Sequence, residues 1–161
     1  AACFGRSRLR EVDADAFEAA LPSLRGKVSD RALLRALHFF DDDRRVPQEV
    51  AALQAGDLAR FFELVVASGE SSWKLLQNLY ADPGEQPLSL ALELSRRMLE
   101  GRGAWRVHGG GFAGTIQAFV PQGLLEAYRA RMDAAFGQGA CVPLNIRPVG
   151  AYELCPGEEP L

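Results

Sequence analysis

The chain has 161 residues, of which 48% are hydrophobic and 24% charged, a composition typical of globular proteins and unlike that of disordered or fibrous ones. Its net charge of −3 disfavours a surface built for nucleic acid or for an anionic membrane. No apolar stretch approaches the roughly 20 residues of a membrane-spanning helix. We therefore expect residues 1–161 to form a single domain with neither a nucleic-acid nor a membrane partner.

The amino terminus and the cysteines suggest where the protein works. The chain begins at Ala1 without a Met and without a signal-peptide pattern, so we expect it to be cut from a longer protein. Cys3, Cys141 and Cys155 are odd in number and widely spaced, which favours reduced thiols and a cytoplasmic location over a disulfide framework. With only His38 and His108 as imidazoles, we expect no metal-binding residues.

Residues 1–103 are predicted to be mainly helical. A helix is expected to begin at Ser29 and Asp30, with apolar residues at helical spacing through Phe40 and, with a small phase shift, through Leu53. Pro47 lies inside this pattern. Because proline removes a backbone donor and crowds the preceding turn, it is expected to kink or break the helix.

Further helices are predicted between turn signals. Gly56 and Asp57 form a stop-and-restart signal, and helices are expected over residues 58–65 and 73–80. Residues 81–87 are rich in turn formers and predict an exposed loop. An amphipathic helix is then expected over residues 88–99, closed by Gly101.

Residues 104–155 are predicted to have the order strand, strand, helix, strand. The strands are expected at residues 104–107, 115–120 and 141–147, and the helix at 124–136; residues 151–161 can add one more strand. With the preceding helix, this order predicts the α+β class: a helix-rich portion followed by a split βαβ (ferredoxin-like) sandwich with an antiparallel sheet, two helices covering one face.

Three consecutive glycines, Gly109, Gly110 and Gly111, separate the first two predicted strands. Each costs about 0.5–1 kcal/mol in a regular element relative to alanine, so a function is expected to require them. A backbone without side chains can approach a ligand closely and direct successive amides at an anion, and Arg106, His108 and Thr115 flank the run. The alternative is a tight hairpin turn in which glycine only relieves crowding. The residues alone leave both interpretations open.

The stretch Trp105-Arg-Val-His-Gly-Gly-Gly-Phe-Ala-Gly-Thr115 is similar to the third conserved motif of the GHMP kinases, in its galactokinase form. Residues 9–12, 17–21, 31–36 and 55–58 also resemble the helical portion that precedes this motif in galactokinases. The resemblance covers nearly the whole chain. It implies the GHMP kinase carboxy-terminal domain, with the amino-terminal lobe absent from this sequence.

The resemblance also implies a division of labour. ATP, Mg²⁺ and a sugar such as galactose would bind between two lobes, and phosphoryl transfer would go to the anomeric hydroxyl. The arginine-containing first motif, the serine-rich phosphate loop and the catalytic aspartate belong to the amino-terminal lobe, and none occurs here. The chain would therefore hold no catalytic residue and, alone, would bind no ATP or Mg²⁺ and show no activity. Its substrate- and ATP-phosphate-binding residues would be His108, Gly109, Gly110, Gly111, Phe112, Ala113 and Gly114.

Two other functions remain open at this stage. One is a galactokinase-like regulatory protein that binds sugar and nucleotide without turnover, and the other is an unrelated α+β ligand-sensing module. Asp41, Asp42 and Asp43 are interpreted as a solvated helix face rather than a Mg²⁺ site, since they are followed by two arginines. Trp73 and Tyr80 are interpreted as core residues rather than a sugar-stacking platform.

Overall fold

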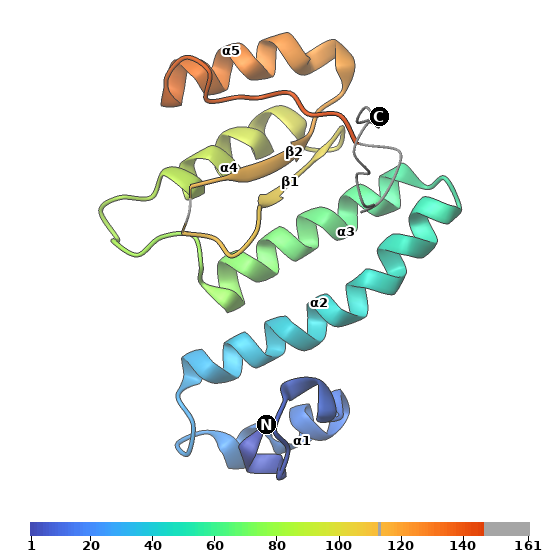
Figure 1. Cartoon of the computed structure of the whole chain (residues 1–161), viewed down its shortest axis with the longest axis vertical. Helices are drawn as coiled ribbons and strands as arrows, with labels where there is room; N and C mark the ends of the chain where they lie inside the picture. Colours follow the sequence, from blue (N-terminus) through green and yellow to red (C-terminus); the bar gives the residue numbers. More distant parts are fainter. Residues whose placement is uncertain (113, 147–161) are drawn as a thin grey trace, which may run out of the picture.

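The structure is a computed structural model that describes residues 1–112 and 114–146. Within these residues the elements follow in the order η1 (Ala2–Phe4), η2 (Leu9–Glu11), α1 (Ala14–Leu24), α2 (Asp30–Gln54), α3 (Leu58–Ser71), η3 (Ser72–Leu76), α4 (Pro87–Leu99), β1 (Ala104–Val107), β2 (Ile116–Phe119), η4 (Gln122–Leu124) and α5 (Leu125–Phe136). Here η3 is a π-helical turn and η1, η2 and η4 are 3-10 turns. A helix-rich chain with a small antiparallel sheet confirms the predicted α+β class (Figure 1).

Side-chain caps determine where three of the helices begin. Asp13, Ser29 and Asp57 each accept a hydrogen bond from the backbone amide three residues later, at the starts of α1, α2 and α3. Gly56, with φ +69°, supplies the left-handed turn before Asp57. The predicted start at Ser29 and the restart at Gly56-Asp57 are both confirmed.

Of the two effects predicted for Pro47, a kink or a break, the break is wrong, because helix α2 runs without interruption through this residue. The proline removes one backbone donor, but packing holds the helix on both sides of it. Leu33 and Phe40 are buried before Pro47, and Ala52 is buried after it. Figure 1 shows α2 as one continuous ribbon.

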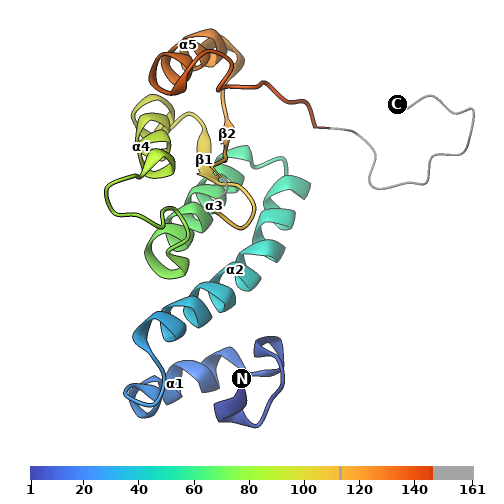
Figure 2. The same cartoon turned by 60° about the vertical axis from the view of Figure 1, so that its left-hand side comes forward.

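The two strands lie between helices. β1 and β2 pair antiparallel, with Ala104 opposite Phe119 and Val107 opposite Ile116. Trp105 and Val107 are buried in the core that they share with α4 and α5. On the other face, the Phe119 ring packs against two phenylalanine rings of α3, at centroid distances of 5.5 and 5.6 Å. The face that carries Trp105 and Val107 therefore packs against α4 and α5, the two helices that were predicted to cover one face, and α3 covers the other face (Figures 1 and 2).

The buried apolar residues form two clusters. One lies around α4, α5 and the sheet and contains Leu79, Leu88, Ala91, Leu92, Leu99, Trp105, Val107, Tyr128 and Met132. The other lies around α1 and the first half of α2 and contains Val12, Phe17, Leu24, Leu33 and Phe40. Figure 2 shows α2 extending from α1 to the side of α3. Helix α2 therefore connects the two clusters.

The separate helix predicted over residues 73–80 is not formed. Helix α3 passes directly into η3, and Gln77, with φ +57°, then turns the chain away. Asn78 and Leu79 are buried after this turn. The apolar residues at helical spacing in this segment are therefore explained by burial of an irregular chain and not by a helix. The predicted loop at residues 81–87 precedes α4, which begins at Pro87, and contains a turn in which Gly84 N donates to Asp82 Oδ1 at 2.7 Å.

The strand predicted at residues 141–147 is wrong over residues 141–146, which adopt no strand conformation. Val142, Leu144 and Ile146 alternate along the chain as a strand would, but they are 68%, 86% and 87% exposed. Alternation along a strand predicts that one face is buried, but among the described residues no core surface packs against these three side chains. The split βαβ sheet therefore has two strands in the described part of the chain. Arg147 and residues 151–161 lie outside the described residues.

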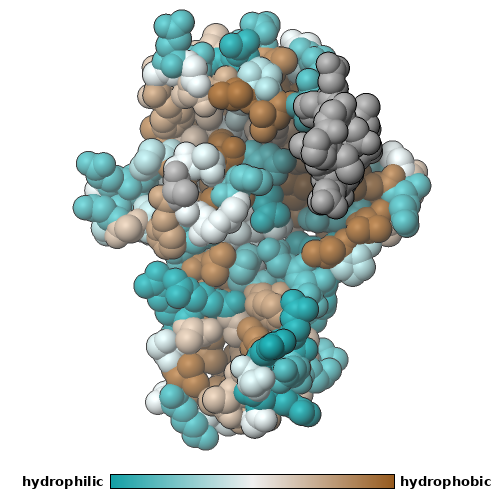
Figure 3. Space-filling view, viewed as in Figure 1, coloured by the Kyte–Doolittle hydropathy of each residue, from teal (hydrophilic) through white to brown (hydrophobic). Residues whose placement is uncertain are grey.

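The second half of α2 carries an exposed apolar strip. Val46, Val50 and Leu53 follow one another at helical spacing and are 57%, 48% and 50% exposed. Figure 3 shows hydrophobic surface at the right-hand end of this helix. Across residues 1–112 and 114–146, no helix is both long enough and apolar enough to span a bilayer.

Candidate glycine-loop site

The glycine run forms the loop between β1 and β2. Gly109, Gly111 and Gly114 have φ values of +67°, +74° and +89°. Phe112 has φ +54° although it carries a side chain, which is 53% exposed. His108, Gly109, Gly110 and Gly114 are also exposed, so the structure brings the predicted site residues together on one loop. Ala113 lies outside the described residues.

Among the residues that the structure describes, three hydrogen bonds hold this loop. His108 N donates to Thr115 O at 3.2 Å, which closes the base of the loop. Phe112 N donates to Asn78 O at 2.9 Å, and Asn78 Nδ2 donates to Gly110 O at 3.1 Å. Sequence reasoning missed Asn78, because it belongs to no motif and lies in a segment predicted to be helical.

Gly110 and Gly111 meet different surroundings. A Cβ added to Gly111 would overlap the carbonyl oxygen of Asn78 and lie 2.6 Å from its Nδ2 atom. A Cβ added to Gly110 would meet no atom within 4 Å. Gly111 is therefore required by packing and backbone conformation, whereas local packing does not explain Gly110.

Successive backbone amides of the loop remain available to a ligand. Within residues 1–112 and 114–146, the amides of Gly109, Gly110 and Gly111 donate to no acceptor. Consecutive free amides in such a turn can bind an anion without any charged side chain. Phosphate is one anion that this chemistry suits.

Arg106, expected beside the glycines, lines a different surface. It borders a cleft of about 230 Å³ whose other lining residues come from α2 and α3 and include Asp42, Glu49 and Ser68. Asp42 accepts hydrogen bonds from Arg45 at 2.7 Å and from Ser68 at 2.9 Å. Burial raises the pKa of Glu49. The cleft thus carries charges of both signs, and one of its carboxylates is already paired.

His38 has neighbours that resemble a serine, histidine and aspartate triad. Its Nδ1 lies 2.9 Å from Ser71 Oγ, and its Nε2 lies 3.5 Å from Asp42 Oδ2. Burial lowers the pKa of His38 more than Asp42 raises it, so the contact with Asp42 involves a neutral imidazole near pH 7. Because Ser71 is only 5% exposed, a substrate cannot reach its hydroxyl. We assign the group a structural role.

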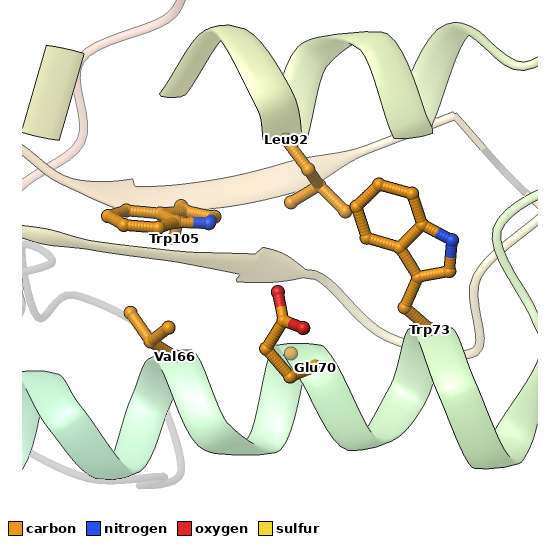
Figure 4. A pocket seen from close by; sticks show the side chains of 6 residues that line it. Val66, Glu70, Trp73, Leu92 and Trp105 are labelled. Carbon is orange, nitrogen blue, oxygen red and sulfur yellow. The ribbon is translucent and has the colours of Figure 1, made fainter. Parts of the chain in front are cut away.

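Trp73 is partly buried and packs against the core. It lines a cavity of about 10 Å³ between α3, β1 and α4, together with Val66, Glu70, Leu92 and Trp105 (Figure 4). That volume holds at most about one water molecule, so neither a sugar nor a nucleotide fits. Trp73 packs against the core, as predicted, whereas Tyr80 is 40% exposed.

Comparison with known proteins identifies the family. The chain is 34% identical to a galactokinase of Pasteurella multocida and 33% identical to one of Mannheimia succiniciproducens, each over 129 residues. It is 29% identical over 126 residues to a galactokinase of Actinobacillus pleuropneumoniae serotype 5b. This chain is a galactokinase homologue.

Each alignment covers 78% of the galactokinase homologue and 31% of its relative. The chain thus spans about a third of the length of the curated galactokinases that it matches. No protein-family model matches it. The homology covers most of the chain and disfavours an unrelated α+β module.

The acidic run of this galactokinase homologue forms ion pairs. Asp41 pairs with Arg44 at 3.2 Å, and Asp42 with Arg45 at 2.7 Å. In the part of the chain that the structure describes, no group of three or more histidine, cysteine or acidic side chains is arranged to hold a metal ion. Cys3 and Cys141 are free thiols, and Cys155 lies outside the described residues.

Proposed function

We propose that residues 1–161 form the carboxy-terminal lobe of a galactokinase-like sugar kinase and that the glycine loop makes one wall of the ATP and sugar cleft. The observation that carries this proposal is the row of amides at Gly109, Gly110 and Gly111 that donate to no acceptor within residues 1–112 and 114–146, in a loop that hydrogen bonds hold in place. Homology to galactokinases over most of the chain supports it. A cytoplasmic location is part of the same proposal.

The loop would act by binding and orientation. Transfer of a γ-phosphoryl group spreads negative charge over phosphate oxygens, and fixed amide dipoles stabilise such charge without reorganising. The exposed Phe112 side chain would help to exclude water from the cleft. In this proposal the loop supplies neither a base nor a nucleophile, and proton transfer from the sugar hydroxyl is assigned to the amino-terminal lobe, where the family's catalytic aspartate lies.

The described residues fit a phosphate better than they fit a cation. The free amides suit a nucleotide phosphate or phosphoryl group. Mg²⁺ requires oxygen ligands, and no suitable acidic group is found in residues 1–112 and 114–146. We therefore place the Mg²⁺ ligands of the proposed enzyme in its amino-terminal lobe.

An assay of the full-length protein beside the isolated chain tests this proposal. With ATP, Mg²⁺ and galactose, we expect phosphorylation by the full-length protein and none by residues 1–161 alone. Turnover by the isolated chain would overturn the proposed division of labour. If the full-length protein binds sugar and nucleotide but does not turn over, it is instead a galactokinase-like regulatory protein.

A further inference from the structure

Asn78 contacts the glycine loop at two points. Its backbone carbonyl accepts a hydrogen bond from Phe112 N, and its side-chain Nδ2 donates one to Gly110 O. Gly111 lies between these two contacts, where any side chain would overlap Asn78. One residue from a segment more than 30 positions earlier therefore holds the centre of the loop.

The segment before Asn78 is itself fixed. Gln77 adopts φ +57°, and its amide donates to Ser72 O at 2.8 Å, which ends the π-helical turn η3. From α2, Arg35 Nε donates to Leu76 O at 3.3 Å. Asn78 is only 3% exposed. The position of the loop is thereby tied to α2 and α3.

The side-chain amide of Asn78 uses its Nδ2 atom to bind the loop, while its Oδ1 atom remains unpaired among the described residues. Its Oδ1 atom is buried and has no hydrogen-bond partner among the described residues. Buried amide side chains normally satisfy both of their ends, so an unpaired acceptor at this position calls for an explanation. Holding Gly110 through Nδ2 supplies one.

We propose that Asn78 is a positioning residue for ligand binding: it sets the peptide planes around Gly110 so that the free amides of Gly109 to Gly111 are presented in a fixed arrangement. The inference rests on the proposed function for the identity of the ligand. The contacts that fix the loop do not depend on that function.

The test compares full-length wild-type protein with Asn78→Leu, which keeps a branched side chain of similar size but cannot donate to Gly110. Ser89→Ala is the matched control, because Ser89 is also buried with an unpaired Oγ but lies on α4. Amide hydrogen exchange in a peptide spanning residues 108–115 is expected to be about 3- to 10-fold faster in Asn78→Leu, the effect of one lost hydrogen bond, and unchanged in Ser89→Ala. Asn78→Ala replaces the leucine variant if that variant does not fold.

Kinetics with ATP and galactose provide the second measurement. Misplaced amides are expected to lower kcat by about 10- to 100-fold at saturating substrates, while the thermal midpoint changes no more than in Ser89→Ala. Unchanged exchange in the loop would overturn the inference, and so would faster exchange with wild-type kcat. Absence of kinase activity in the wild-type protein would overturn the proposed function, and the exchange measurement would still decide whether Asn78 holds the loop.

Discussion

At the residue scale, Gly110 and Gly111 are neighbours with different reasons to lack a side chain. Gly111 combines φ +74° with direct contact to Asn78, so its identity follows from the folded structure. Gly110 has open space where a Cβ would lie. A ligand that approaches the backbone closely would explain Gly110, which makes it the more informative residue for function.

Gly111→Ala is expected to lower the free energy of unfolding by about 1–3 kcal/mol. The new methyl group must displace Asn78, and the alanine backbone must keep an unfavourable positive φ. Urea titration of the chain measures this change. Gly110→Ala is the control and should be close to neutral. Equal stability of both variants would show that the contact with Asn78 does not constrain the loop.

His38 makes a second residue-scale prediction possible. Burial lowers its pKa; Asp42 and Asp41 oppose this effect, and Arg45 and Arg106 reinforce it. The folded state therefore keeps His38 neutral at a pH where the unfolded chain, with an ordinary value of 6.5, already binds a proton. Acidification through this range therefore favours the unfolded chain.

The free energy of unfolding is expected to fall between about pH 7.5 and about pH 5.5, and less steeply in His38→Asn than in the wild type. Denaturant titrations across this range give both slopes. Glu49, whose raised pKa acts in the opposite direction, is present in both proteins, so the difference between the slopes isolates His38. Equal pH dependence of the free energy of unfolding in the wild type and in His38→Asn would contradict the lowered pKa of His38.

At the element scale, α3 approaches β1 closely because Gly69 lacks a side chain. An added Cβ would lie 3.0 Å from Arg106 Cβ and 3.1 Å from both Arg106 Cα and Trp105 O. Two of these three atoms belong to the strand backbone and cannot rotate away. The close contact sets the distance between the helix and the sheet from which the glycine loop extends.

Gly69→Ala is expected to destabilise the chain by about 1–3 kcal/mol, since forcing the helix and strand apart outweighs the gain in helix propensity. Thermal or urea unfolding measures the loss. Gly123→Ala, at an exposed position with no atom within 4 Å, provides the matched control. A stabilised Gly69→Ala variant would mean that α3 and β1 can separate without cost.

The sequence predicted some elements better than others for physical reasons. Strand β1, helix α4 and helix α5 were located within a residue or so, because their apolar residues are buried with the period of the element itself. The alternation at residues 142–146 predicted a strand, but sequence does not reveal whether a partner strand is present. The helix predicted over residues 73–80 from apolar spacing does not form, because Gln77, in a left-handed conformation, ends η3 in the middle of that segment.

At the scale of the whole molecule, the site combines what sequence shows with what only the fold shows. The exposed glycine loop was predicted from three adjacent glycines and its resemblance to a kinase motif. The hydrogen bonds that join the loop to Asn78 were not predicted, because this contact depends on how α3, η3 and β1 pack together in the fold. Arg106 was expected beside the glycines but lines the cleft next to α2, and this position also depends on tertiary packing.

The most direct test of the account is Gly110→Val in the full-length protein, assayed for ATP-dependent phosphorylation of galactose and for unfolding by urea. Because the structure leaves space at Gly110, we expect a loss in kcat/KM of at least about tenfold, with a stability change below about 1 kcal/mol. A loss of activity no larger than the loss of stability, or wild-type activity, would contradict the proposal that this loop serves phosphoryl transfer.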